Sequence, residues 1–175
     1  MEHKAFLFDY DAFVTELAPV LQDALLSNDA VALADFLDQN LADLRHPMEH
    51  HKLDEDWRSE LVEVDVQIVA DLALTKYYDP REDYGLGEAW DDLWDFLEEF
   101  GLQEVMLGRA FGRGERIFCP GTIGSYFQTP EQVTDNLKRL DELYQDNPEI
   151  EDELDEIGIL FQRAARARRG LYVTF

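Results

Sequence analysis

The residues best suited to chemistry in this sequence lie in a histidine-rich segment. His46, Glu49, His50 and His51 bring imidazole and carboxylate groups close together in the chain. Zn²⁺ or Ni²⁺ would need two imidazoles on one side and a carboxylate, and His46 and His50 have the i, i+4 spacing of a helix. Pro47 works against a regular helix at that point. We therefore interpret the segment as a solvated loop and expect no cofactor, with His46, His50 and His51 as the alternative metal ligands.

Carboxylates are so numerous that a pair of them identifies no catalytic site. The chain has 39 Asp and Glu residues among 175, and a glycosidase needs only two carboxylates at a set separation. The acids of residues 79–88 surround a glycine, but their spacing does not match a calcium-binding loop. A small metal-assisted hydrolase that uses the His46–His51 cluster or the Asp79–Asp95 acids is thus the alternative function, and the leading one is non-enzymatic.

Two other features invite a chemical interpretation. Cys119 is the only cysteine, so it has no disulfide partner, which is typical of a reducing cytoplasm. Because every histidine lies far from it in sequence, we interpret it as a small buried apolar residue. Arg109, Arg113 and Arg116 form a glycine-rich basic segment that could hold a phosphate or carboxylate. We favour instead a loop that docks on the chain's own acidic residues.

The uneven charge of the chain is its most informative property. The net charge is −24, and residues 1–100 hold 26 acidic residues against six basic ones. Folding does not need that excess, because self-repulsion weakens a compact state. An acidic surface repels nucleic acid and anionic lipid and attracts basic proteins. We therefore expect neither nucleic-acid nor membrane binding, and we expect a basic protein partner. Salt adaptation or genome composition could also produce the acidity.

Aromatic residues beside acids suggest where such a partner would bind. Aromatic side chains are enriched at protein interfaces and supply much of their binding energy. The alternative is that the same aromatics are core residues near helix ends. The predicted contact residues are Tyr77, Tyr78, Asp79, Asp83, Tyr84, Trp90, Asp91 and Tyr126. A homodimer without separate activity is a third hypothesis.

Apolar residues at helical spacing predict helices in the first part of the chain. One is capped by Asp9 or Asp11 and is kinked or broken at Pro19. A second ends at Arg45, so the two form a helical hairpin. Further along the chain, another amphipathic helix is expected to carry Trp90, Leu93, Trp94 and Leu97 and to end near Gly101.

Residues 57–74 are ambiguous between helix and strand. Strict alternation across 62–68 would suit a strand, yet the apolar pattern continues at helical length. We therefore favour a helix, split by Asp65 as a second cap.

From residue 101 the sequence becomes glycine-rich and predicts short strands. We expect them at 105–107, 116–118 and 125–127, with 171–175 as a closing strand and 5–8 as either a strand or the lead-in to a helix.

Two helices are expected near the C-terminus. Thr129-Pro130-Glu131-Gln132 has the pattern of a capping box with proline at the first helical position. A last helix follows the break at Asn147-Pro148. It begins acidic, ends basic and is closed by Gly170.

These elements predict a mainly helical α+β fold. An N-terminal helical hairpin or bundle is followed by a small sheet packed with two C-terminal helices. We expect one domain, 1–175, with an acidic helical lobe at 1–100 and a mixed α/β lobe at 101–175. No apolar run approaches the roughly 18 residues of a transmembrane helix, and the N-terminus has no leader pattern, so we expect a cytoplasmic protein.

The C-terminal half resembles the YfbM-like family of uncharacterised bacterial proteins. The resemblance covers roughly residues 75–175 and rests on a helix with Trp90 and Leu93, a glycine-rich β region, the run YFQTPEQV at 126–133, and FQRAARARRGLYVTF at the end. Asp95 and Phe96 stand where that family pattern would place a histidine. The resemblance implies a bacterial α+β protein and carries no activity over to these positions.

Overall fold

The computed structural model describes residues 2–61, 64–121, 123–146 and 151–175. It confirms a mainly helical α+β fold, in which helices flank a small antiparallel sheet. The sheet has the strand order β1-β6-β5-β2. Its strands are β1 (Lys4–Phe8), β2 (Arg109–Ala110), β5 (Ser125–Gln128) and β6 (Gly170–Thr174).

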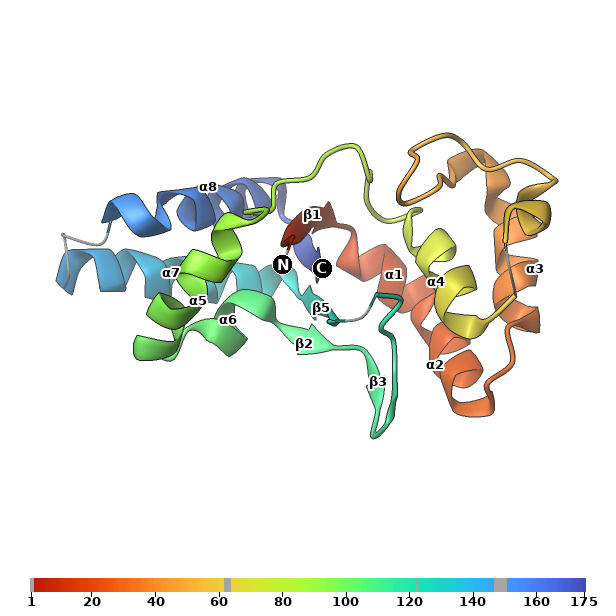
Figure 1. The fold of residues 1–175 in the computed structure, drawn as a ribbon, viewed down its shortest axis with the longest axis horizontal. Helices are drawn as coiled ribbons and strands as arrows, with labels where there is room; N and C mark the ends of the chain where they lie inside the picture. The colour runs from red at the N-terminus through yellow and green to blue at the C-terminus, as the bar shows by residue number, and fades with distance from the viewer. Residues whose placement is uncertain (1, 62–63, 122, 147–150) are drawn as a thin grey trace.

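The two ends of the chain meet in the middle of the molecule. β1 and β6 pair antiparallel, with Lys4 opposite Thr174 and Phe8 opposite Gly170, and both termini lie beside the sheet in Figure 1. The apolar run at 5–8 is therefore a strand, the first of its two predicted alternatives. The predicted closing strand at the C-terminus is confirmed.

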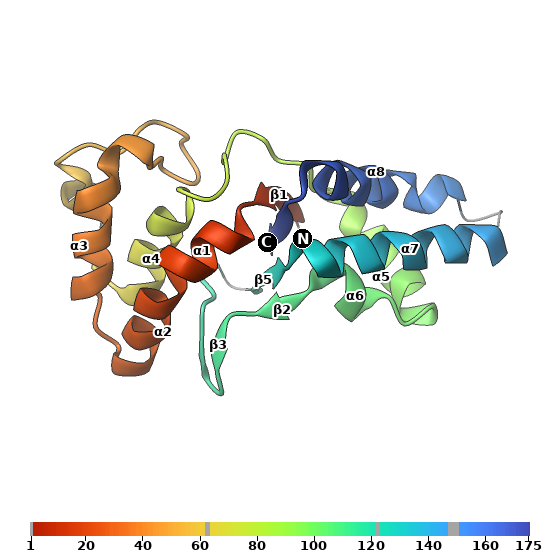
Figure 2. The same ribbon diagram turned by 180° about the vertical axis from the view of Figure 1, so that it is seen from behind.

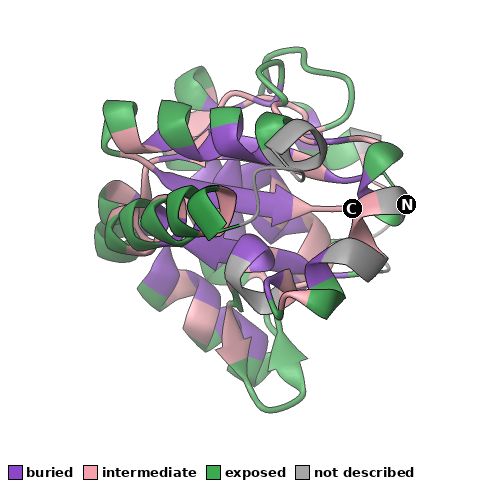
Figure 3. Ribbon diagram, turned by 90° about the vertical axis from the view of Figure 1, so that its left-hand side faces the viewer, coloured by how far each residue is buried: buried purple, intermediate pink, exposed green. Residues whose placement is uncertain are grey.

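Strand alternation gives the sheet a separate hydrophobic core on each face. Phe6, Phe8 and Tyr172 belong to one cluster of buried residues, whereas Ala5 and Val173 belong to the other. Side chains two residues apart point to the same face of a strand, so the two cores share one sheet. In Figure 3 the buried strands lie inside a shell of helices whose outer surfaces are exposed.

The first core is covered by helices from the N-terminal part of the chain. They are α1 (Tyr10–Glu16), α2 (Ala18–Ser27), α3 (Val31–Asn40) and α4 (Val66–Leu74), with short 3₁₀ helices η1 (Leu41–Asp43) and η2 (Trp57–Glu60). The predicted break at Pro19 is confirmed, because α1 ends at Glu16 and proline lies in the first turn of α2. Asp9 caps α1, its Oδ1 accepting the Ala12 N–H at 3.2 Å.

The ambiguous stretch at 57–74 resolves into two separate helices. The Asp65 Oδ1 accepts the Ile68 N–H at 2.9 Å and so caps α4, as predicted. Residues 64–65 are not helical, and 62–63 lie outside the described residues. The buried Trp57 of η2 donates its Nε1–H to the Asp38 carboxylate at 3.0 Å, which ties η2 to α3.

The second core is covered by the remaining helices. They are α5 (Ala89–Glu99), α6 (Gln103–Leu107), α7 (Pro130–Asp146) and α8 (Glu151–Ala167). α7 and α8 run side by side and extend away from the sheet in Figure 2. Along the helical N-terminal part of the chain, Tyr78 is the last buried residue that belongs to the first core. The next buried apolar residue, Leu86, belongs to the second core. Helix α5 therefore packs in the second core together with the C-terminal helices.

Two local predictions in the glycine-rich region are wrong. Residues 105–107 are the end of α6, because Leu102 and Met106 make a helical turn that buries both side chains in the second core. Gly170 does not end α8; Arg168 takes the left-handed conformation (φ 53°), and Gly170 opens β6. A side chain at Gly170 would place its Cβ 2.2 Å from the Gln128 carbonyl oxygen, so glycine is required for strand pairing there.

The other predicted strands are confirmed. β3 (Gly112–Arg113) and β4 (Arg116–Ile117) form a separate two-stranded hairpin that projects from the body in Figure 1, and β5 covers the third predicted strand. The capping box at 129–132 is also present, with reciprocal bonds of 2.9 Å and 3.1 Å between Thr129 and Gln132. The break at 147–148 lies outside the described residues.

Candidate functional site

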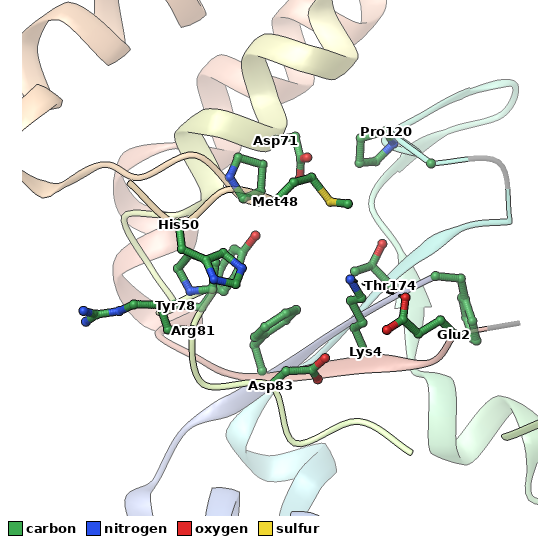
Figure 4. A pocket seen from close by; sticks show the side chains of 15 residues that line it. Glu2, Lys4, Met48, His50, Asp71, Tyr78, Arg81, Asp83, Pro120 and Thr174 are labelled. Atoms are coloured by element: carbon green, nitrogen blue, oxygen red, sulfur yellow. Dashed lines mark ion pairs between the residues drawn. The ribbon is translucent and has the colours of Figure 1, made fainter. Parts of the chain in front are cut away.

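A pocket of about 410 Å³ opens beside the sheet between distant parts of the chain. Its walls come from β1, α4, the loops at 47–50 and 78–83, the Pro120 turn and the C-terminal end of β6. In Figure 4, Asp71 descends from α4 between Met48 and Pro120, and Lys4, Glu2 and Asp83 line the opposite side. This volume lies within the range typical of ligand pockets.

Asp71 is the unusual group in this pocket. It lies on α4, whose other inward-facing residues are apolar, and its carboxylate has no hydrogen-bond or ion-pair partner among the described residues. Burial raises the pKa of Asp71 to about 7, since desolvation disfavours the charged form. The residue as a whole is only half-buried, because its side chain faces the open pocket.

Two tyrosines lie close enough to Asp71 for its negative charge to affect their pKa values. Burial raises the pKa of Tyr78 and of Tyr172, and the negative charge on Asp71 raises both further. Each phenol therefore stays protonated at neutral pH, and the Tyr78 side chain lines the same pocket as Asp71. The Tyr172 hydroxyl also shares a hydrogen bond of 3.3 Å with Ser125.

The cations of the pocket are already paired with other acids. The Lys4 Nζ lies 3.6 Å from a Glu2 carboxylate oxygen. The Arg81 Nε donates to the Asp79 Oδ1 at 2.8 Å, and hydrogen bonds from Arg81 lower the pKa of Asp79 to about 2. When Asp71 is ionised, it and Asp83 therefore leave the pocket with an excess of negative charge.

Asp83 has a structural task at the pocket rim. Its Oδ1 accepts the N–H of Ala5 at 3.0 Å and that of Gly85 at 2.8 Å. The Tyr84 N–H then donates to the Ala5 carbonyl at 2.8 Å. Residues 83–87 thus cover the outer edge of β1, which would otherwise expose unpaired backbone groups.

The structure places the predicted contact residues in different environments. Tyr77, Tyr78 and Trp90 are buried, with exposed fractions of 4%, 7% and 1%, so they are core residues near element ends. Tyr78 still lines the pocket together with Asp83. Asp79 lies beside the pocket through its bonds to Arg81.

The remaining predicted contact residues lie away from the pocket. Tyr84 is half-buried in a smaller cleft, where the Arg163 guanidinium lies 4.9 Å from its ring centre. Asp91 is exposed on α5, and Tyr126 is half-buried on β5. Neither of these last two residues lines the pocket around Asp71.

The histidine segment forms an exposed loop rather than a helix. The rings of His46 and His51 stack with centres 5.4 Å apart, and the His46 Nδ1 accepts the N–H groups of Met48 and Glu49. His50 has φ 65° and lines the rim of the Asp71 pocket instead. The described residues contain no group of three His, Cys, Asp or Glu side chains placed to hold a metal ion.

The arginine segment lies on and beside the projecting hairpin. Arg109, Arg113 and Arg116 are exposed, and none forms an ion pair with a described residue. The hairpin is anchored by a neutral side chain: Gln67 donates to the Ile117 carbonyl at 2.9 Å and accepts the Cys119 N–H at 2.7 Å. The expected docking of this loop through acidic residues is absent from the described part of the chain. Cys119 itself is half-buried rather than fully buried.

Sequence reasoning missed Asp71, Lys4 and Thr174 as pocket residues. One signal was available for Asp71, since it is a lone acid inside the apolar stretch VQIVADLAL. An acid on a helix with so few polar positions is rarely buried without a partner or a function. Lys4 and Thr174 carry no such signal, because only the pairing of the two terminal strands brings them to the pocket.

Comparison with models of known families, with curated proteins and with solved structures finds no match. The resemblance to the YfbM-like family therefore stays a prediction. No helix in the described part of the chain is long and apolar enough to cross a membrane.

Proposed function

We propose that this protein is a non-catalytic binding protein that docks a basic protein partner, in the manner of an immunity protein or an inhibitor. One observation carries the proposal: the Asp71 carboxylate faces an open pocket and has no partner among the described residues. A desolvated acid without a counter-charge weakens the fold that contains it. A cation supplied by another molecule would remove that cost.

The net charge of the whole chain also supports binding to a basic protein. A net charge of −24 accelerates encounters with basic proteins and disfavours nucleic acid and anionic lipid. The pocket face combines this charge with apolar surface from Phe6, Met48 and Pro120. Interfaces that bind tightly have such a composition, with apolar contacts at the centre and polar groups around them. We further propose that the protein acts in a bacterial cytoplasm, where its single cysteine would stay reduced.

The proposal is tested by capturing partners on the immobilised protein at low and at high salt. We expect a basic protein to be retained at low ionic strength and released at high ionic strength, since salt screens exposed charges. Glu2→Gln combined with Asp71→Asn should abolish retention.

A matched variant separates a docking site from general acidity. Asp23→Asn combined with Asp35→Asn removes the same charge from exposed positions on α2 and α3, outside the pocket. Retention should survive this change. Equal loss in both double variants, or no basic protein retained by the wild-type chain, would contradict the proposed function.

A further inference from the structure

We infer that the Asp71 pocket receives one lysine side chain of the partner, with the ammonium group bound at the Asp71 carboxylate. This inference deepens the proposed function and rests on it. It adds the chemical identity of the group that enters the pocket, and it makes binding dependent on pH.

The shape and lining of the pocket fit a lysine. Part of the lining is apolar, with Phe6, Pro47, Met48 and Pro120 available to the four methylene groups of a lysine stem. The charged group is Asp71, which Figure 4 places between Met48 and Pro120. An alkyl chain that ends in a cation matches this combination of an apolar lining and a carboxylate.

The groups around Asp71 favour an incoming cation over an incoming anion. Lys4 and Arg81 already have the carboxylates of Glu2 and Asp79 as partners. The Tyr78 phenol stays neutral, so its oxygen can accept a hydrogen bond from an ammonium group. A carboxylate or phosphate ligand would meet the charges of Asp71 and Asp83 instead.

Binding of a cation must also change the protonation of Asp71. The free pocket holds this carboxyl with a pKa of about 7, and a bound ammonium favours the ionised form and lowers that pKa. Each complex formed below pH 7 therefore releases a proton. We expect the dissociation constant of the lysine group to rise about tenfold for each unit of pH below 7, and to be nearly constant above it.

Other titratable or charged groups also face this site, and the test must separate them. Six of them line the pocket and come from β1, the N-terminal residues before it, the 47–50 loop and the 78–83 loop: Lys4, Glu2, His50, Tyr78, Arg81 and Asp83. Tyr172 on β6 interacts electrostatically with Asp71, and Cys119 in the turn after β4 interacts with Tyr172. His50 is the only imidazole among them. His50→Gln keeps a hydrogen-bonding side chain of similar size and removes the imidazole.

The experiment uses Nα-acetyl-lysine methylamide as the probe, which keeps a free side-chain ammonium group. Its binding is measured by chemical-shift titration of the full chain at low salt. The matched control probe is N-acetyl-norleucine methylamide, which keeps the alkyl stem and lacks the ammonium group. We expect the lysine probe to shift the amides of α4 and β1, and the norleucine probe to bind at least about tenfold more weakly. Equal binding of the two probes would overturn the inference.

Two variants assign the pH dependence. Asp71→Asn should weaken the lysine probe at pH 8 and make its binding independent of pH between 5 and 8, whereas His50→Gln should retain the wild-type profile. If the pH dependence disappears in His50→Gln and persists in Asp71→Asn, Asp71 is not the binding carboxylate.

Failure of the inference and failure of the proposed function give different results. Probe binding that requires Asp71, without any retained basic protein, would contradict the proposed function and keep the lysine site. A basic protein whose retention requires the pocket carboxylates, while the lysine probe does not bind, would overturn the inference alone.

Discussion

At the level of single residues, Asp71 combines an unfavourable environment with a position in the proposed binding pocket. It occupies an apolar helix and lacks a partner among the described residues, and burial raises its pKa from 3.8 to about 7. The folded state therefore holds the proton more tightly than the unfolded state. The stabilisation associated with that proton is complete below about pH 4 and is lost as the pH rises through 7.

The stability of Asp71→Asn should consequently depend on pH relative to wild type. A shift of three pKa units corresponds to about 4 kcal/mol, and water in the open pocket reduces this to about 2 kcal/mol. We expect the variant to be more stable by about 2 kcal/mol at pH 8 and nearly equal to wild type at pH 4. Urea unfolding at both values measures this difference, with Asp23→Asn as the control. A destabilised variant at pH 8 would contradict the environment described for Asp71.

His3 is a buried histidine that should remain neutral far below its usual range. Its Nδ1 accepts the Leu86 N–H at 3.1 Å, and its ring stacks on Trp90 with centres 4.4 Å apart. Burial lowers its pKa to about 4. Its contribution to stability is therefore present above about pH 6.5 and is lost as the pH falls through 4. An NMR titration of the ring protons measures the pKa directly, and a midpoint near 6.5 would show that His3 is solvated.

Among the secondary-structure elements, α7 has an N-terminal capping box whose contribution to stability can be measured with one substitution. Thr129 and Gln132 form the reciprocal bonds of a capping box. Thr129→Ala should lower the free energy of unfolding by about 1 kcal/mol, because it leaves a helix-end N–H without its acceptor. Thr134→Ala on the same helix is the matched control and should change stability by less than about 0.5 kcal/mol. Equal effects of the two substitutions would show that the cap contributes nothing specific.

Local signals explain which elements the sequence could predict. The caps at Asp9, Asp65 and Thr129 and the broken helix at Pro19 depend on neighbouring residues, and all four are present in the structure. The strand expected at 105–107 fails because its few apolar residues suit either element, and contacts with the second core select a helix.

The candidate site was harder to predict because long-range pairing builds it. The sequence singles out His50, Tyr78 and Asp83, yet only the fold brings them to one pocket beside Lys4 and Thr174. It predicts Trp90 and Tyr77 at a surface, and they are buried by contacts that no local pattern specifies. Burial of an aromatic residue depends on which elements pack over it, so spacing alone does not decide it.

At the scale of the molecule, the net charge of −24 should make stability sensitive to salt. Like charges repel more strongly in the compact state than in the unfolded chain, and physiological salt screens them beyond about 8 Å. We expect sodium chloride to raise the free energy of unfolding at pH 8, by on the order of 1 kcal/mol between low and physiological ionic strength. The effect should shrink near pH 4, where many carboxylates are protonated. Unfolding curves that do not respond to salt at pH 8 would show that the acids are dispersed too widely to interact.

We propose that one acidic pocket, rather than the acidic surface as a whole, binds a basic partner. The most direct measurement is a ¹⁵N chemical-shift map of the full chain during titration with a short lysine-rich peptide at low salt. We expect the shifted amides to cluster around Asp71, Tyr78 and Thr174, and we expect Asp71→Asn to remove this cluster. Shifts spread evenly over α2, α3, α7 and α8, and unchanged in the variant, would contradict the proposal.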